Sequence, residues 1–386
     1  MLNEQEELIT RGLSYFKRGD FSLGYRTILD AALHTDSNEV YKKTLAFVEV
    51  YEKETSENKS SLFTQLEKCA QEIRKIPVKN PKLLGSTILK GNQLVKEYNK
   101  GRFVLGPIDV ELKKGDIYGL VGENGNGKTT LLTILGHLIT PTSGNLSFSF
   151  SKNIEDDYDL KSKLVYIPQR TGVWYGSVID NLKFSLVHHG VTGEKNNLLV
   201  HMMIARFGLW NYKDLKWKEL SSGYKMRFEL ARTLLRKPEI VLLDEPLANL
   251  DILAQQIILE DLKMLAKSHV NPIAMVFSSQ QLYEVEKTSD DVIYLRNGQP
   301  IASLDIEEKG QYNLVVELDS ENARDKVEGL FINNELKKIE FNGGVYILYF
   351  NEGITFNDVL TIISKKEFSI KYIRDISNST RRFFVY

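Results

Sequence analysis

A glycine-rich segment in the first half of the chain has the spacing of a loop that binds phosphate groups. Residues 122–129 read GENGNGKT, which fits the pattern GxxxxGK followed by Ser or Thr. A segment typical of a strand precedes it at 116–121, and a segment typical of a helix follows at 130–135. In such a loop, backbone N–H groups converge on phosphate oxygens at the start of a helix. The residues predicted to bind the nucleotide here are Gly122, Asn124, Gly125, Asn126, Gly127, Lys128, Thr129 and Thr130.

Four side chains in and beyond this loop have the chemistry of nucleoside-triphosphate hydrolysis. Lys128 places a cation on the β- and γ-phosphates, and the Thr129 hydroxyl can ligate Mg²⁺. Asp244 and Glu245 follow the apolar segment IVLL at 240–243. Ligands bind at the carboxyl edge of parallel strands, so these two acids are expected beside the phosphates. We predict that Asp244 holds Mg²⁺ and that Glu245 is the general base that polarises the attacking water.

The segment between these two motifs narrows the class of protein. Residues 220–235 read LSSGYKMRFELARTLL, which resembles the LSGGQ signature and following helix of the ABC (ATP-binding cassette) ATPases. Ser222 stands where the family has its second glycine, and Tyr224 stands where it has glutamine. The resemblance implies that Ser221, Ser222 and Gly223 contact ATP. It also implies that the signature of one cassette covers the ATP held by another, so we expect a homodimer.

Further family elements follow in order over residues 86–300. Tyr98 occupies the position of the aromatic residue that stacks on adenine, and Gln169 that of the glutamine that contacts Mg²⁺ and the γ-phosphate. Asp251 matches the acidic position of the loop that crosses to the other cassette. Gln280 stands where the family usually has a histidine that contacts the γ-phosphate. An amide donates a hydrogen bond but carries no proton or charge near neutral pH, so we expect Gln280 to position the phosphate without acting as an acid.

The order of predicted elements divides the chain into three parts. Residues 1–80 are predicted to form about four helices, either distantly similar to tetratricopeptide repeats or a helical docking module of no named family. Residues 86–303 are predicted to form the α/β cassette, with an antiparallel β-subdomain and a helical subdomain over 170–218. Residues 310–386 follow the order βαββαβ of a small ferredoxin-like α+β domain.

Composition bears on the partners and the location of the chain. The net charge is −1, so we expect no direct nucleic-acid partner. The single cysteine, Cys69, fits a reducing compartment, and the first residues lack the pattern of a secretory signal. No run of about 18 apolar residues occurs, so membrane contact is expected through a separate transmembrane permease. We expect a cytoplasmic protein on the inner face of the membrane.

The favoured function is the ATP-hydrolysing subunit of an ABC transporter, with export favoured by the order of the domains. Two alternatives stay open: a soluble ABC ATPase of translation or DNA handling, and a slow regulatory scaffold, which Gln280 and the altered signature would suit. Trp174 and Tyr175 also have two interpretations. They either anchor the membrane partner or pack inside the helical subdomain.

Overall fold

The N-terminal unit is a bundle of four helices in a computed structural model of the chain. The helices are α1 (Glu4–Lys17), α2 (Phe21–His34), α3 (Asn38–Lys53) and α4 (Phe63–Arg74), with the 3₁₀ turn η1 (Lys59–Leu62) before α4. The structure describes residues 4–77, 84–98, 101, 103–150, 157–268, 270–280, 282–300, 312–331, 336–342, 344–351, 353–365 and 368–377.

Local sequence explains where these helices begin and how they pack. Asp20 and Ser37 cap α2 and α3 by accepting hydrogen bonds from backbone N–H groups of the first turn. At Gly24 the helices α1 and α2 approach so closely that a Cβ would lie 2.7 Å from the backbone nitrogen of Phe16. The rings of Tyr25 and Tyr51 stack at 3.9 Å between α2 and α3.

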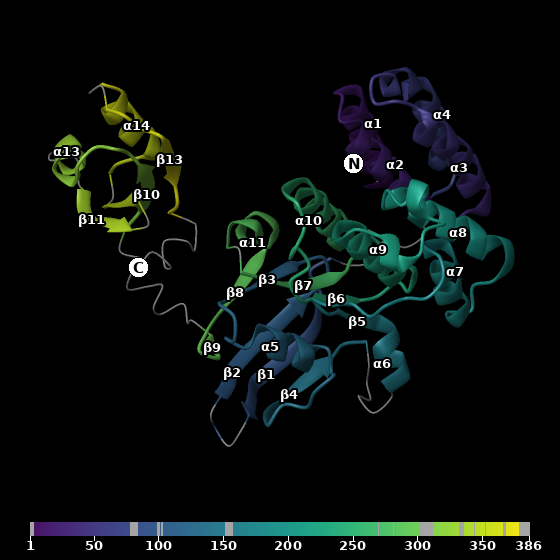
Figure 1. The fold of residues 1–386 in the computed structure, drawn as a ribbon, viewed down its shortest axis with the longest axis horizontal. Coiled ribbons are helices and arrows are strands. Elements are labelled where there is room, and N and C mark those ends of the chain that lie inside the picture. The colour runs from purple at the N-terminus through teal and green to yellow at the C-terminus, as the bar shows by residue number, and fades with distance from the viewer. Residues whose placement is uncertain are drawn as a thin grey trace.

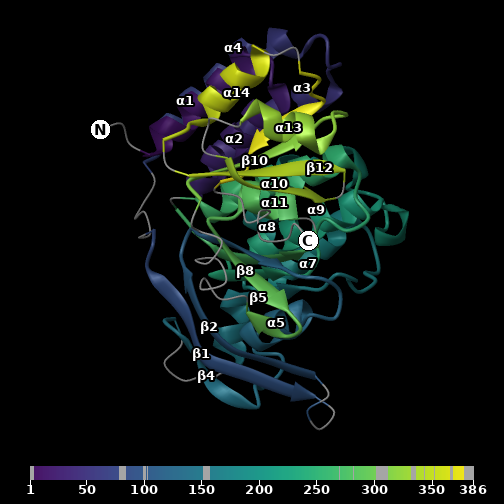
Figure 2. The same ribbon diagram turned by 90° about the vertical axis from the view of Figure 1, so that its left-hand side faces the viewer.

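Two sheets form the central unit (Figures 1 and 2). An antiparallel sheet has the order β2-β1-β4, from β1 (Thr87–Tyr98), β2 (Phe103–Lys113) and β4 (Ser143–Phe148). The core sheet has the order β5-β6-β7-β3-β8-β9, with parallel pairing from β5 through β8 and the short β9 (Gln299–Pro300) antiparallel at its edge. The remaining core strands are β3 (Ile117–Val121), β5 (Leu164–Ile167), β6 (Ile240–Leu243), β7 (Ala274–Ser279) and β8 (Asp291–Arg296).

Helices cover the core sheet, which is why its inner strands are buried throughout. Every residue of β3, β6 and β7 is buried, as expected for parallel strands covered on both faces. The covering helices of the core are α5 (Lys128–Leu135), α10 (Ile252–Ala266) and α11 (Leu282–Thr288), and the short α6 (Asp157–Lys163) precedes β5. This arrangement places the ends of β3, β6 and β7 side by side.

The helical subdomain consists of α7 (Val178–His188), α8 (Gly193–Arg206) and α9 (Ser222–Leu235), with the 3₁₀ turns η3 (Trp210–Tyr212) and η4 (Trp217–Glu219) between the last two helices. The first two helices lie in the predicted range 170–218, and α9 extends beyond it. Trp174 is half-buried here, which fits the interpretation that its ring packs inside the subdomain. Its indole Nε1 donates to Glu229 Oε1 at 2.8 Å, and its ring packs edge-on against Phe228. Tyr175 is 86% exposed.

The C-terminal unit has the ferredoxin-like order predicted from the sequence. Its elements are β10 (Leu314–Asp319), α13 (Arg324–Leu330), β11 (Leu336–Asn342), β12 (Val345–Phe350), α14 (Phe356–Ser364) and β13 (Tyr372–Asp375). The sheet is antiparallel with the order β11-β12-β10-β13, and α13 and α14 contribute Val327 and Val359 to its core. Gly343, between β11 and β12, and residue 310, where the domain was predicted to begin, lie outside the described residues. Among the described residues, no helix is long and apolar enough to cross a membrane.

A buried ion cluster joins the N-terminal unit to the cassette. Arg206, at the end of α8, donates from Nε to Asp30 Oδ1 and from Nη1 to Asp261 Oδ1, each at 2.6 Å. Arg26 Nη1 donates to the same Asp261 oxygen at 2.7 Å. Burial alone would lower the pKa of Arg206, but Asp261 and Asp30 raise it above its usual range. We call Arg26, Asp30, Arg206 and Asp261 the junction cluster.

Breaking the junction cluster is expected to destabilise the protein strongly. Arg206 is fully buried, and its removal leaves Asp30 without that charge partner. We expect Arg206→Met to lower the free energy of unfolding by about 3–5 kcal/mol, the cost of leaving a buried charge uncompensated. Urea denaturation measures this. The matched control is Lys42→Met, which breaks the exposed Lys42–Glu194 pair between the same two units and should cost about 1 kcal/mol or less. Equal losses in the two variants would contradict the prediction.

Candidate nucleotide site

The glycine-rich loop connects β3 to α5 in the geometry that its sequence predicts. Gly125 and Gly127 have φ angles of 84° and 97°, in the left-handed region that favours glycine. A Cβ on Gly122 would lie 2.5 Å from the backbone oxygen of Leu295, so this position also needs glycine. Helix α5 begins at Lys128, two residues before the start predicted from the sequence, so the loop ends at a helix N-terminus.

Lys128 folds back over this loop. Its Nζ donates to the backbone oxygens of Gly122 and Glu123 at 2.6 and 3.2 Å. The same nitrogen lies 3.4 Å from Glu245 Oε1. Only 6% of the Lys128 side chain is exposed, so the ammonium group is held inside the site rather than in bulk solvent.

Asp244 is the centre of a hydrogen-bond network at the end of β6. Its Oδ2 accepts hydrogen bonds from Thr129 Oγ1 at 2.7 Å and from the Tyr166 hydroxyl at 3.3 Å. Its Oδ1 accepts from Ser278 Oγ at 2.7 Å. Burial and the neighbouring Asp244 raise the pKa of Tyr166, which keeps its hydroxyl protonated as a donor. The network holds the Asp244 carboxylate against the first turn of α5.

Glu245 has an unusual backbone and an unsatisfied carboxylate. Its φ angle is 48°, which is rare for a residue other than glycine, and strain of this kind is concentrated at functional sites. Its backbone N–H donates to Ser278 Oγ at 2.8 Å and is held there. Its Oε1 is buried and has no hydrogen-bond partner among the described residues. This oxygen therefore lies beside the phosphate loop with the Lys128 ammonium group as its charged neighbour.

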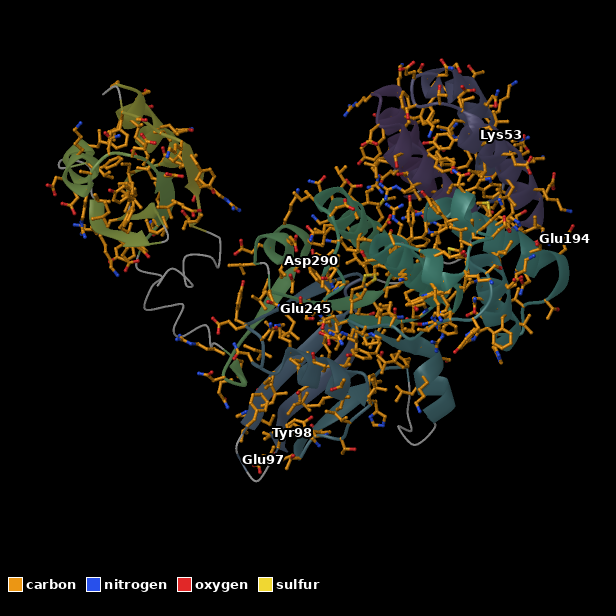
Figure 3. The ribbon with its side chains drawn as sticks, viewed as in Figure 1. Lys53, Glu97, Tyr98, Glu194, Glu245 and Asp290 are labelled. Carbon is orange, nitrogen blue, oxygen red and sulfur yellow. The ribbon has the colours of Figure 1, made fainter. Side chains whose placement is uncertain are left out.

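A cavity of about 370 Å³ lies over the loop and combines residues from distant parts of the sequence. Figure 3 labels Tyr98 at the antiparallel sheet and Glu245 at the core sheet. Tyr98 is 37% exposed and its ring centroid is 6.4 Å from that of Phe103, so the two rings provide an aromatic surface at one side. The cavity is lined by Tyr98, Phe103, Glu123, Asn124, Gly125, Gly127, Lys128, Thr129, Thr130, Gln169 and Glu245.

The predicted signature residues form a second cluster, outside the lining of this cavity. Ser221 caps α9 by accepting a hydrogen bond from the backbone nitrogen of Tyr224. Ser222 Oγ donates to the backbone oxygen of Asn249 at 2.7 Å. Asp251 caps α10, whose Ala254 would lie 3.4 Å from a Cβ on Gly223. Within one chain, the signature and the loop containing Asp251 thus form one surface, separate from the phosphate loop.

Gln280 also lies outside the lining of the cavity. It follows β7 directly and is exposed.

Asn126, in the glycine-rich loop, bonds to the turn that follows β8. Its side chain donates to the backbone oxygen of Leu295 and accepts from the backbone nitrogen of Asn297. Of the predicted residues, the structure therefore brings together the loop, Tyr98, Gln169, Asp244 and Glu245, whereas the signature, Asp251 and Gln280 are not among the residues that line the cavity.

Three residues near the site were not singled out from the sequence: Tyr166, Ser278 and Glu284. Ser278 is fully buried and connects Asp244 to the backbone of Glu245. It follows the apolar residues AMVF within β7, and this change from apolar to polar residues is the signal that marks it. Glu284, on α11, has a buried Oε2 without a hydrogen-bond partner among the described residues.

Glu284 is expected to make stability depend on pH. Burial, and the charge of Glu245, raise the pKa of the Glu284 carboxyl, so its ionised form is disfavoured in the folded chain. The cost is absent below the ordinary pKa of glutamate, about 4.3, grows as pH rises from there to the raised value, and is constant above it. We therefore expect Glu284→Gln to be more stable than the native chain at pH 8, with a smaller difference at pH 5. Thermal unfolding at both pH values measures this, and a difference independent of pH would contradict it.

Comparison with known proteins agrees with this geometry. The sequence model of the ABC transporter family matches residues 105–248. The uncharacterized ABC transporter ATP-binding protein MJ1023 of Methanocaldococcus jannaschii is 30% identical over 55% of this chain and 76% of its own length. The uncharacterized ABC transporter ATP-binding protein YcbN of Bacillus subtilis is 29% identical over 61% of this chain and 75% of its own length. The spermidine/putrescine import ATP-binding protein PotA of Mycoplasma mycoides subsp. mycoides SC is 33% identical, and the match covers 60% of PotA.

Solved structures share the fold of the central unit. The cbiO1 subunit from Clostridium perfringens, part of the ABC transporter complex cbiONQ, matches with a TM-score of 0.51 at 24% identity, covering 58% of this chain and 92% of cbiO1. The dimeric bacterial ABC transporter cassette MJ0796 matches with a TM-score of 0.50. The chain belongs to the ABC transporter ATP-binding proteins. It is an ATP-binding cassette and an ATPase, as the resemblance predicted.

Proposed function

We propose that the chain is the ATP-hydrolysing subunit of an exporter, in which pairing of two cassettes drives a separate transmembrane subunit at the cytoplasmic face of a membrane. The observation that carries the hydrolytic part is the Glu245 carboxylate, 3.4 Å from Lys128 Nζ and unsatisfied beside the phosphate loop. In this proposal residues 1–80, 86–303 and 310–386 are three domains, of which the second binds the nucleotide.

The cavity accounts for recognition of ATP. Tyr98 stacks on the adenine ring, and the backbone N–H groups of the loop bind the phosphates at the start of α5. Lys128, now bound to two backbone oxygens, transfers its hydrogen bonds to the β- and γ-phosphates.

Thr129, Asp244 and Gln169 fit a magnesium site. Thr129 and Asp244 are already in contact, and Gln169 lines the same cavity as Thr129. Among the described residues no group of three or more His, Cys, Asp or Glu side chains is placed to hold a metal ion. The donor set is instead a hydroxyl, a carboxylate and an amide, which are oxygen ligands suited to Mg²⁺ together with phosphate oxygens and water. The bound ion would neutralise charge on the β- and γ-phosphates.

Hydrolysis in this proposal uses Glu245 as the base. Its carboxylate accepts a proton from water while the water oxygen bonds to the γ-phosphorus and the bond from that phosphorus to the bridging oxygen breaks. The products are ADP and phosphate. Ser278 holds the backbone of Glu245 at a φ angle of 48°, which fixes where the carboxylate points.

Two chains complete each site. The cluster of Ser221, Ser222, Gly223 and Asp251 lies apart from the phosphate loop of its own chain, and we propose that it covers the ATP of the partner chain. The N-terminus of α9 then points its dipole and the Ser221 hydroxyl at the γ-phosphate of that ATP. A cassette dimer is a known form of this fold, as MJ0796 shows.

An exposed apolar surface on the helical subdomain is the proposed contact with the membrane subunit. Val173 and Tyr175 precede α7 and are 50% and 86% exposed, and Phe184 and Val187 on α7 are 60% and 51% exposed. Exposed aromatic and aliphatic side chains of this kind anchor protein interfaces. Trp174 packs inside the subdomain and is excluded from this contact.

Photo-crosslinking tests this contact. A photoreactive amino acid replacing Tyr175 should capture a multi-spanning membrane protein in membranes of the source cells. The same amino acid replacing Val50, an exposed residue of α3, is the matched control and should capture no such protein. Equal capture from both positions, or from neither, would contradict the proposed contact.

The direction of transport has two candidates. The ferredoxin-like unit after the cassette favours export, while PotA, the relative that is 33% identical, is named as a spermidine/putrescine import protein. Deletion of the gene separates them. Export predicts increased sensitivity to toxic compounds, and import predicts loss of growth on a limiting nutrient. In either case the native gene should restore the phenotype and a gene encoding Glu245→Gln should not.

Gln280 is proposed to donate to the γ-phosphate once ATP and the partner chain are bound. We expect Gln280→Ala to slow turnover by about 10- to 1,000-fold, the range for loss of one positioned transition-state donor. Gln280→His should keep ATP affinity and alter turnover, since both side chains donate but only histidine becomes cationic. Steady-state hydrolysis at saturating MgATP measures this. Equal rates for the native chain and Gln280→Ala would show that residue 280 does not reach the phosphate.

A further inference from the structure

The N-terminal unit contacts both parts of the cassette at the joint between them. Its helix α2 reaches the core through Arg26, which bonds to Asp261 on α10 at 2.7 Å and to Glu260 at 2.8 Å. The same helix reaches the helical subdomain through Asp30, which bonds to Arg206 on α8 at 2.6 Å. Figures 1 and 2 both show the N-terminal helices beside α8 and α10. One helix therefore contacts both the part of the cassette that carries the phosphate loop and the part that carries the signature.

Asp261 joins the N-terminal unit, the helical subdomain and the core at one carboxylate. Its Oδ1 accepts from Arg26 of the N-terminal unit and from Arg206 of the helical subdomain, while its own helix α10 belongs to the core. Only 1% of the Asp261 side chain is exposed. Water therefore screens these charges little, and the lengths and directions of the bonds are strongly constrained.

Contacts continue without a break from the junction cluster to the signature. Two residues after Arg206, a Cβ on Gly208 would lie 3.0 Å from Arg227 Nη1, so the Arg227 guanidinium packs on the turn that ends α8. The Arg227 guanidinium lies 5.3 Å from the ring centre of Tyr224. The backbone nitrogen of Tyr224 donates to Ser221 Oγ, the cap of α9.

A parallel contact supports the same turn. The rings of Tyr212, in η3, and Tyr224 are 3.9 Å apart, and their hydroxyl groups are 2.9 Å apart. Tyr212 follows α8 by a few residues, so both routes link the end of α8 to the start of α9. Tyr224 stands where the family has glutamine, and its ring therefore ties the signature to the segment that the N-terminal unit holds.

We propose that the N-terminal unit positions the signature of the cassette through the junction cluster. Arg26, Asp30, Arg206 and Asp261 are positioning residues: they touch no nucleotide and act by fixing the end of α8, on which Arg227 and Tyr224 rest. The partner recognised by the positioned signature is the ATP of a second copy of this chain, and to that extent the inference rests on the proposed function.

Hydrogen–deuterium exchange in the nucleotide-free chain tests the positioning itself. Asp30→Asn keeps the shape of the side chain and removes its charge, so the fold should persist. We expect faster exchange in peptides covering 221–227 in this variant, and native exchange there in the control Lys42→Met, which breaks an exposed pair between α3 and α8. Arg26→Met leaves the Arg206–Asp30 bond intact and is the second test. Native exchange over 221–227 in both Asp30→Asn and Arg26→Met would overturn the proposal.

Pairing of cassettes gives the functional readout. In the Glu245→Gln background with saturating MgATP, Asp30→Asn should raise the dissociation constant of the dimer by roughly 5- to 150-fold, the range of typical couplings between sites. Binding of a fluorescent ATP analogue to the single chain should stay within about twofold, within the error of additive behaviour for distant sites.

The variant Leu66→Ala distinguishes a general loss of stability from a loss of positioning. Leu66 is fully buried in α4, away from the junction cluster, and its removal should destabilise the N-terminal unit. The two variants are compared at the same loss of melting temperature. If Leu66→Ala then weakens pairing as much as Asp30→Asn does, the proposal is overturned. If Glu245→Gln with an intact junction fails to pair at all, the proposed function is wrong, and the exchange measurement still decides the positioning.

Discussion

Replacement of Glu245 by glutamine is expected to reduce ATP hydrolysis by about 10²- to 10⁴-fold, the contribution of a positioned general base. Glutamine keeps the size of the side chain, and its amide can still contact water, but it accepts no proton. The structure gives the reason for this choice of base, because Glu245 Oε1 is buried beside Lys128 and has no hydrogen-bond partner among the described residues. Nucleotide affinity should be retained.

The control for this prediction is the neighbouring carboxylate of Glu284. It is buried on α11 and lies outside the lining of the phosphate cavity. The raised pKa of Glu284 favours its neutral form, so Glu284→Gln should lose far less hydrolysis than Glu245→Gln. A phosphate-release assay at saturating MgATP compares the two. Native turnover in Glu245→Gln would refute its assignment as the base, and a loss found only in Glu284→Gln would transfer the role to that residue.

Replacement of Lys128 by alanine is expected to act on binding. The Nζ group is held inside the loop by two backbone oxygens, so it is already placed for phosphate before ATP arrives. Hydrogen bonds to charged groups contribute about 1.5–3 kcal/mol each, so the dissociation constant for ATP should rise by roughly 10- to 150-fold. Loss of Lys128 also leaves Glu245 without its nearest cation, which makes phosphate binding less favourable still.

Equilibrium binding of a fluorescent ATP analogue measures this effect. The matched control is Lys90→Ala, which removes a lysine whose side chain is 53% exposed on β1 and is absent from the lining of the cavity. Lys128→Ala with native affinity and reduced turnover would contradict the assignment, because it would move the role of Lys128 from binding to catalysis.

Local patterns predicted the phosphate loop and the fold class because their physical cause is local. The left-handed φ angles of Gly125 and Gly127 and the cationic side chain of Lys128 follow from the spacing of eight residues. The ferredoxin-like order followed in the same way, from alternating strands and a turn. The roles of the individual site residues stay predictions, although the structure does bring Tyr98, Gln169 and Glu245 to one cavity.

What the sequence did not predict depends on packing between distant segments. Ser278 contacts Asp244 because β7 lies next to β6 in the core sheet, an order that strand patterns alone do not give. The Arg26–Asp261 pair joins residues 235 positions apart, and no local pattern relates them. The sequence left open whether Trp174 is exposed or packed, because the partner of its indole, Glu229 on α9, lies 55 positions further along the chain.

Measurement of molecular mass tests the central claim most directly, since the claim is that two chains close around ATP. Glu245→Gln should elute at its monomer mass of 44.2 kDa without nucleotide and at twice that mass with saturating MgATP, as measured by light scattering. The dimer should be lost when Ser221→Ala is added, because the signature is proposed to bind the partner's ATP. A single mass of 44.2 kDa under both conditions, in a chain that binds ATP, would contradict the account.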